Sequence, residues 1–339
     1  MASEWLLIET FGGHRRREPT LLAVGSSPRN MVPLRTILGR GPYLNDVLAL
    51  VSRVVGSGES IRTTTTDGRR QMIGEPLRTF GGRVHGVWVW VDKLDQTPPR
   101  RDLAGAFHQN LTTLISSRSD DLLDVYGVAP ENRVHVHSLA EQFGRLGTNT
   151  DEARALAMLV KSEPGVEHQA TWTVTRDDGI RRAVNFACRC VAEDTPSGRR
   201  EVVVRGITHD IGPAEAVPAA PPVVPVLLAQ QVVAAEQTPG RWRAIVDLRT
   251  MRLLKWLDDA VPGIAWRMDS AFPPGIHRQD LAAAARMRDA LDSSGRVEAV
   301  LRFRTTDGGW MRLVAIANLM LLDQYTTAAL VTLSIPVDA

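Results

Sequence analysis

The histidines are the first candidates for chemistry, because an imidazole can ligate a metal or transfer a proton. Only His135 and His137 are spaced so that both side chains lie on one face of an extended segment. A metal site would need further ligands from distant parts of the chain, so we expect none. His277 precedes a predicted helix, where a histidine could ligate haem, but no second ligand supports that role. We therefore interpret His277 as a capping or packing residue.

A hydrolytic site is the second candidate, because Asp177, Asp178, His209 and Asp210 could act as acids and bases if the fold brought them together. Asp178 precedes Gly179, however, and aspartate in that position commonly stabilises a turn by bonding nearby backbone groups. The sequence has no nucleophile elbow, phosphate-binding loop, zinc-protease motif or dinucleotide-binding glycine pattern. We expect no catalytic residue, no enzyme activity and no cofactor, and keep a hydrolase assembled between modules as the alternative.

Composition and cysteine usage restrict the class of protein. Lys and Arg number 40 against 38 Asp and Glu, which gives no electrostatic reason to expect nucleic acid or an anionic membrane as a partner. No apolar stretch approaches the ~20 residues that span a bilayer, and the N-terminus lacks a signal-peptide pattern. Cys188 and Cys190 lie two apart in a predicted strand, with Cα atoms roughly 6.6–6.8 Å apart, the upper limit for a disulfide. A reduced, cytoplasmic protein is expected.

Three Asp-Gly pairs, each between two apolar-rich runs, indicate the elements that organise the chain. They are Asp67-Gly68, Asp178-Gly179 and Asp307-Gly308. Such a pair predicts a two-residue hairpin turn, because glycine reaches positive φ at little cost. The pairs are spaced by about one domain length, and each follows a helical stretch and precedes one more strand. We interpret this as one plan used three times, giving α+β modules with a central antiparallel sheet flanked by helices.

Hydrophobic periodicity predicts the remaining elements. In the first module, strands are expected at 5–8, 21–24, 61–66, 70–80 and 84–91, with a helix over 44–55. In the last of these strands, Trp88 and Trp90 face away from the valines, so both faces are apolar and one could be buried against another domain. In the third module, strands are expected at 243–248, 253–257, 297–304, 310–319 and 327–335, with a helix over 281–291.

The middle module is expected to open with a helix, from the spacing of Leu103, Ala106, Phe107, Leu111 and Leu114. A second helix is predicted over 153–160, followed by strands at 170–176, 181–191 and 201–208. Alternation in the strand at 181–191 predicts one buried and one exposed face. Residues 213–225 are rich in proline and alanine and predict an extended spacer, and residues 226–236 can be helical.

The order of strands, helices and a three-stranded meander resembles PAS and GAF sensor domains. The likeness is sharpest in Gly275-Ile-His-Arg-Gln-Asp280 before a helix, and in Phe303-Arg-Thr-Thr-Asp-Gly308 before a strand that begins at Trp310. The whole chain is similar to a mycobacterial or actinobacterial family of PAS–GAF–PAS architecture without an effector domain. That resemblance implies a PAS-like domain at 1–93, a GAF-like or PAS-like domain at 94–212, a linker and short helix at 213–238 and a PAS domain at 239–339. It also implies a non-enzymatic sensor or scaffold.

Two sets of site residues follow. Tryptophans of the third module are expected mainly to pack in the core, or alternatively to line a small apolar cavity between sheet and helices. The ligand-pocket candidates are Trp256, Trp266, His277, Arg302, Trp310 and Asn318. The interaction-surface candidates are Val314, Ile316, Trp88 and Trp90, because their strands carry apolar groups on both sides. The expected partner is a separate effector protein, with a small apolar ligand and a homodimer as further expectations, and no metal.

Overall fold

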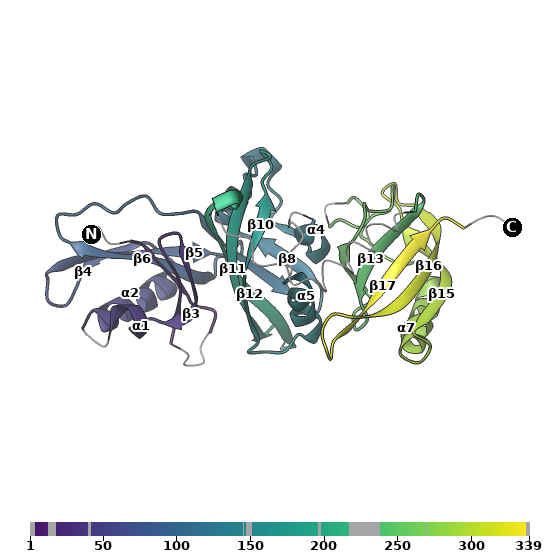
Figure 1. Ribbon diagram of the computed structural model, residues 1–339, viewed down its shortest axis with the longest axis horizontal. Helices are drawn as coiled ribbons and strands as arrows, with labels where there is room; N and C mark the ends of the chain where they lie inside the picture. Colours follow the sequence, from purple (N-terminus) through teal and green to yellow (C-terminus); the bar gives the residue numbers. More distant parts are fainter. Residues whose placement is uncertain are drawn as a thin grey trace. The chain divides into compact units, whose positions relative to one another are not determined.

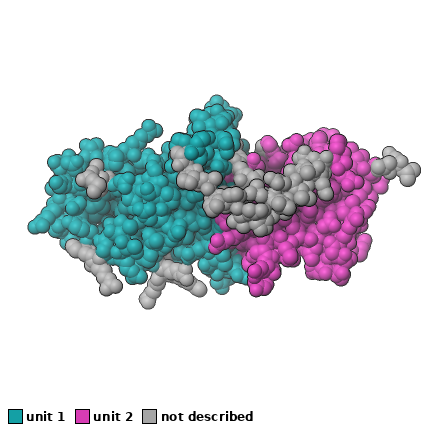
Figure 2. All heavy atoms as spheres, viewed as in Figure 1, with its two compact units in different colours: residues 1–110, 117–135, 163–218 teal, residues 111–116, 136–162, 219–339 magenta. Residues whose placement is uncertain are grey.

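The computed structural model describes residues 4–12, 18–39, 42–144, 146, 151–195, 198–216, 238–268 and 270–336. Within these residues, three antiparallel sheets and a few helices form an α+β fold (Figure 1). The chain divides into two compact units (Figure 2): residues 1–110, 117–135 and 163–218 form unit 1, and residues 111–116, 136–162 and 219–339 form unit 2. No helix among the described residues is long and apolar enough to cross a membrane.

The first sheet has the strand order β3-β2-β1-β6-β5-β4. Its strands are β1 (Leu6–Glu9), β2 (Thr20–Val24), β3 (Ser27–Pro33), β4 (Ile61–Thr64), β5 (Arg70–Arg78) and β6 (Val84–Lys93), and its helices are α1 (Arg35–Leu38) and α2 (Pro42–Ser57). Val47, Leu50 and Val51 of α2 pack on Val87 and Val89 of β6. The predicted strands and the predicted helix are confirmed, whereas β3 was not predicted.

The other face of the first sheet carries tryptophans and is covered within unit 1 by the second sheet. Trp88 and Trp90 have no exposed surface, and they cluster with Ala104, Ala187 and Ile207 of the second sheet. The expectation that one face of this strand is buried against another domain is confirmed. The prediction that Trp88 and Trp90 form a surface for an external partner is wrong, because the chain itself buries both rings.

The second sheet has the order β10-β11-β12-β7-β8-β9. Its strands are β7 (Ala104–Asn110), β8 (Ile115–Arg118), β9 (Val136–Ser138), β10 (Glu167–Thr175), β11 (Arg181–Asp194) and β12 (Arg200–Pro213), with α3 (Asp120–Val125), η1 (Pro130–Asn132), α4 (Leu139–Phe143), α5 (Glu152–Lys161) and η2 (Ala214–Ala216) between or after them. The three long strands and α5 were predicted. β11 was expected to have one exposed face, but Asn185 and Arg189 on that face are also buried, because the first sheet covers this side.

The helix predicted over Leu103 to Leu114 is wrong, since this segment forms β7 and the turn that leads to β8. β7 pairs along its length with β12, from Ala104 opposite His209 to Asn110 opposite Val203. Apolar residues here fit both a helical and an alternating pattern, and pairing with a distant strand decided between them. Glycine at position 105 fits the strand, because a Cβ there would lie 2.1 Å from the backbone nitrogen of Leu122.

The third sheet has the order β14-β13-β17-β16-β15. Its strands are β13 (Arg241–Asp247), β14 (Arg252–Trp256), β15 (Arg296–Arg304), β16 (Trp310–Leu321) and β17 (Thr327–Ser334), and η3 (Arg278–Asp280) leads into α7 (Leu281–Ser294). Leu291 of α7 packs against Ala317 and Ala329 of the sheet, and Figure 1 shows α7 beside β15 and β16. The predicted strands and helix are confirmed. The expected spacer from residue 217 onward and the helix over 226–236 lie outside the described residues.

The glycines of the three hairpins adopt positive φ, as predicted. The angles are +66° at Gly68, +81° at Gly179 and +86° at Gly308. The turns are longer than the predicted two residues, however. In the third hairpin the N–H of Gly308 donates to Thr305 O at 3.1 Å and the N–H of Thr305 donates to Gly309 O at 3.1 Å, so glycine is the last residue of a three-residue loop. Asp307 accepts bonds from the Thr305 hydroxyl and the Gly309 N–H, which lower the pKa of its carboxyl.

Within unit 2, helices from the middle of the sequence pack against the third sheet. α4 lies against β14, and α5 against β17. Lys255 of β14 donates to the carboxylate of Glu152 at the start of α5, and Lys161 at the end of α5 lies 2.8 Å from a carboxylate oxygen of Asp323 in the β16–β17 loop. The segment between β9 and β10 of the second sheet thus covers part of the third.

Candidate functional site

Trp256 and Trp266, the first two pocket candidates, lie in the core of the third module. They join the cluster around Leu313 and Leu333, with their rings edge to face and ring centroids 6.3 Å apart. Packing is therefore their main role in the described structure, as expected. The buried Nε1 of Trp256 has no acceptor among the described residues, so it is a polar group in this core that could donate to a ligand.

His277, Arg302 and Trp310 lie together near the start of η3, where protein groups already bond to His277 Nδ1 and to the Arg302 guanidinium. His277 Nδ1 accepts from the backbone N–H of Gln279 at 3.2 Å, which confirms the capping role, and the His277 and Trp310 ring centroids are 4.6 Å apart. Arg302 donates twice to Asp280, at 2.7 and 2.9 Å. These bonds lower the pKa of Asp280 to about 2. Arg302 therefore anchors a turn.

Asn318 lies away from the tryptophan cluster. Side chains alternate along a strand, so Asn318 shares one face of β16 with Val314 and Ile316, whereas Leu313 and Ala315 on the opposite face are buried in the core. The prediction that Asn318 shares one pocket with Trp256 and Trp266 is wrong for this reason. We call the face of the third sheet that carries Val314 and Ile316, opposite α7, the outer face.

Strand register aligns the outer-face side chains in rows. One row runs Val300, Val314, Ser334 and Arg241, the next runs Glu298, Ile316, Thr332 and Arg243, and a third runs Arg296, Asn318, Leu330 and Ile245. Val314 and Ile316 are half-buried, and Val300 is 44% exposed. The outer face thus has an apolar centre that water partly reaches.

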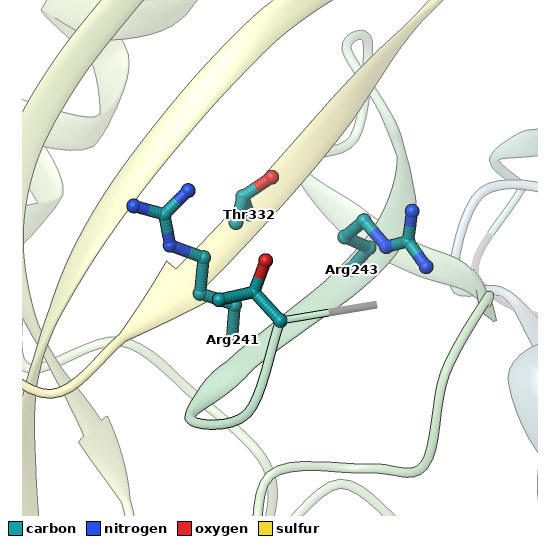
Figure 3. A pocket seen from close by; sticks show the side chains of 4 residues that line it. Arg241, Arg243 and Thr332 are labelled. Carbon is teal, nitrogen blue, oxygen red and sulfur yellow. The ribbon is translucent and has the colours of Figure 1, made fainter. Parts of the chain in front are cut away.

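A hollow lies on the outer face beside this centre. Its volume is about 340 Å³, and Thr238, Arg241, Arg243 and Thr332 line it (Figure 3). Arg243 turns its guanidinium away from Thr332 and donates to Asp258 at 2.7 and 2.8 Å. Arg241 has no carboxylate partner within the described part of the chain. A guanidinium and a threonine hydroxyl that line one hollow can each donate to an anionic group. The sequence interpretation missed both arginines.

The acids and the histidine proposed for hydrolysis have separate partners. The Asp210 carboxylate accepts from Arg182 Nε at 2.9 and 3.0 Å. His209 Nε2 lies 3.4 Å from Asp102, and its ring meets the Trp88 ring edge to face at 5.4 Å. The contact with His209 lowers the pKa of Asp102, although burial opposes it.

Asp178 and the remaining metal or thiol candidates have structural surroundings. The Asp178 carboxylate accepts the N–H of Ile180 in the hairpin, as expected of turn chemistry. His135 lies 3.0 Å from a carboxylate oxygen of Asp120. Within the described ranges, no three metal-binding side chains come together. Both cysteines are free and buried, and burial raises the pKa of Cys190 to about 11.

A buried polar group in unit 1 was not predicted. The His85 ring is fully buried between Phe11 and His108, with centroid distances of 6.0 and 6.2 Å. Burial, and then the nearby His108 and Arg205, lower the pKa of His85 to about 3. Glu193 accepts from Arg205 at 2.7 Å. Burial alone would raise the pKa of Glu193, but His108 and Arg205 lower it to about 2.

Three family models match successive parts of the chain. Residues 4–100 match the model described as Rv3651-like, N-terminal, residues 103–210 match Rv3651-like, middle domain, and residues 226–339 match Rv3651-like, C-terminal domain. A crystal structure of an uncharacterized protein from Mycobacterium tuberculosis is 30% identical, with a TM-score of 0.85, over 99% of this chain and 97% of that chain.

Other solved structures are much less similar. A sensory box histidine kinase/response regulator from Burkholderia thailandensis is 16% identical, with a TM-score of 0.24, over 40% of this chain and 87% of that one. An RNA-binding light-oxygen-voltage receptor is 11% identical, with a TM-score of 0.27, over 68% of this chain and 95% of that one. Scores this low do not establish a shared fold. No curated protein matches the chain.

Proposed function

Because the chain belongs to the Rv3651-like family and contains its N-terminal, middle and C-terminal domains in order, we propose that it is a non-enzymatic sensor or scaffold that acts through protein–protein contacts. The outer face of the third sheet carries this proposal. Val314, Ile316 and Val300 form an apolar centre there that is only partly buried. An exposed apolar surface with a polar surround is typical of interaction sites.

The PAS and GAF assignment of the three modules belongs to this proposal. It is supported by the three hairpins with a positive-φ glycine and by the short η3 turn that leads into α7 before the meander. A small apolar ligand in the third module is a further part of it, supported by the buried N–H of Trp256 that has no acceptor among the described residues. A cytoplasmic location and a homodimer complete the proposal.

Replacing Val314 and Ile316 together by lysine tests the proposed surface. We expect the double variant to keep its circular dichroism spectrum and melting temperature, since both side chains are half-exposed, and to lose the proteins that cross-link to the wild type in its own host. Lysines at Val55 and Ile180, which are exposed apolar positions of unit 1, provide the matched control. Unchanged capture and unchanged assembly by native mass spectrometry in the folded double variant would refute the surface role.

A hydrolase screen, with and without added divalent metals, tests the non-enzymatic part. We expect no turnover, because the carboxylate of Asp210 is paired with Arg182. Reproducible hydrolysis that is abolished in a folded Asp210→Asn variant would replace the scaffold by an enzyme.

A further inference from the structure

We infer that the outer face of the third sheet binds an acidic, amphipathic segment of a partner protein. This inference rests on the proposed function and adds the chemistry of the partner. Two groups of residues define the surface. The apolar stripe consists of Val300, Val314 and Ile316, and the arginine rim consists of Arg241, Arg296 and Arg312.

The apolar stripe is continuous. Val300 and Val314 are directly opposite each other on β15 and β16, and Ile316 follows Val314 on the same face. Neighbouring strands lie about 4.8 Å apart, so these branched side chains are in contact range of one another. A partner that covers them must present apolar side chains of its own.

The arginine rim places three positive charges around this stripe. Arg241 is two strands beyond Val314 in its row, with Ser334 between them, Arg312 precedes Val314 on the same face, and Arg296 lies opposite Asn318. None of the three has a carboxylate in ion-pair range within the described ranges, whereas Arg243 and Arg302 are paired with Asp258 and Asp280. Glu298 is the one exposed carboxylate among the described strand residues of this face. Charge complementarity therefore selects an acidic partner.

The hollow beside the stripe gives one carboxylate a defined position. Arg241 and Thr332 lie on neighbouring strands around it (Figure 3), and the guanidinium and hydroxyl are both donors that suit a carboxylate. The row that contains Thr332 also contains Ile316. An acidic side chain can thus reach the hollow while an apolar neighbour on the same segment contacts the stripe.

The same arginines could attract a nucleic acid, but the surface favours protein. Binding of single strands uses exposed aromatic faces for base stacking. Trp310, two residues before Arg312, is 37% exposed, but Arg304 lies 3.9 Å from its ring centroid and His277 meets the ring edge to face, so protein groups already contact this ring. The centre of the face consists of aliphatic side chains, which offer phosphates no partner.

Fluorescence anisotropy with defined peptides tests the inference. The probe is a fluorescein-labelled amphipathic peptide of about 18 residues with leucines at i, i+3, i+4 and i+7 and glutamates elsewhere, and its counterpart carries lysines in place of the glutamates. We expect saturable binding of the acidic peptide to the full chain, weakened by salt. The double variant Arg241→Glu with Arg312→Glu should bind it about tenfold more weakly. Arg53→Glu with Arg62→Glu, at exposed positions of unit 1, changes net charge equally and should have no effect.

Several outcomes would overturn the inference. These are no binding of the acidic peptide by the wild type, equal binding of the lysine peptide, or equal weakening by the control variant. Rim-dependent binding of an oligothymidylate or of phosphatidylglycerol vesicles, with none of the acidic peptide, would assign the face to another class of partner. If cross-linked partners are lost in the Val314 and Ile316 lysine variant but retained in the rim variant, the proposed function stands and the acidic chemistry fails.

Discussion

His85 should make the stability of unit 1 depend on pH. Its ring is fully buried, and burial together with His108 and Arg205 lowers its pKa from the ordinary 6.5 to about 3. In the unfolded chain the imidazole regains its ordinary pKa, so protons bind the unfolded state more tightly. The stability that depends on neutral His85 is therefore complete above pH 6.5 and is lost as the pH falls from 6.5 toward 3.

The magnitude follows from the two pKa values. Below the unfolded pKa the free energy of unfolding falls by about 1.4 kcal/mol per pH unit, so the loss between about pH 7.5 and about pH 5 is roughly 2 kcal/mol. Glu193 also has a lowered pKa, about 2 against an ordinary 4.5, but its contribution is lost only as the pH falls below 4.5. The interval above pH 5 therefore separates the contribution of His85 from that of Glu193.

Urea unfolding of the full chain, followed by circular dichroism at several pH values, measures this effect. In His85→Leu the free energy of unfolding should fall less steeply below pH 6.5 than in the wild type. The slope should decrease by nearly the value for one proton, about 1.4 kcal/mol per pH unit, because the group that titrates is gone. Phe11→Leu is the matched control, since Phe11 packs on the same ring and does not titrate. It should lower stability by a similar amount at every pH. Equal slopes for the wild type and His85→Leu would refute the assignment.

Two further perturbations test unit 2 by urea unfolding. Gly308→Val should lower stability by roughly 1–2 kcal/mol, because its φ of +86° penalises a side chain and a Cβ would lie 2.6 Å from the Phe272 ring. Gly275→Val, where a Cβ meets nothing within 4 Å, should change less, and equal losses would contradict the turn argument. Glu152→Gln should lower stability by about 1–3 kcal/mol, because it leaves the mostly buried Lys255 unpaired. Adding Lys255→Met should recover part of that loss. If the losses of stability of the two single variants simply add in the double variant, the ion pair between Glu152 and Lys255 does not contribute to stability.

Local signals in the sequence predicted most of the third module and the hairpins. Alternation of apolar residues and an Asp-Gly pair act over a few residues, so they specify strands such as β15 and β16 without knowledge of the fold. The segment at Leu103 to Leu114 could not be assigned in that way. Its apolar spacing fits both the 3.6-residue period of a helix and the two-residue period of a strand. Pairing with β12, which is distant in sequence, favours the strand.

The candidate site was predicted less well for a related reason. Trp88 and Trp90 correctly indicated a second apolar face of β6, but nothing near them in sequence shows that the second sheet covers it. The sequence placed Asn318 on the correct strand. It did not show which face of that strand α7 covers, because this depends on how the helix packs on the sheet. Arg241 is placed on the outer face by the register between β13 and β17. These two strands are neighbours in the sheet but lie at opposite ends of the module in sequence. Such rows across strands are properties of the folded sheet.

Apolar side chains of the outer face become more exposed from β13 to β15, and this gradient shows which part of the face is available to a partner. Ile245 of β13 is 3% exposed and lies beside Lys255, whose ammonium group pairs with Glu152 of α5. Val314 of β16 is half-buried, and Val300 of β15 is 44% exposed. The cover supplied by the middle segment therefore ends partway across the sheet. Because the strands continue beyond it with branched apolar side chains, the face is chemically suited to a second cover. The arginines around it, which have no carboxylate partner among the described residues, determine the charge that this cover must carry.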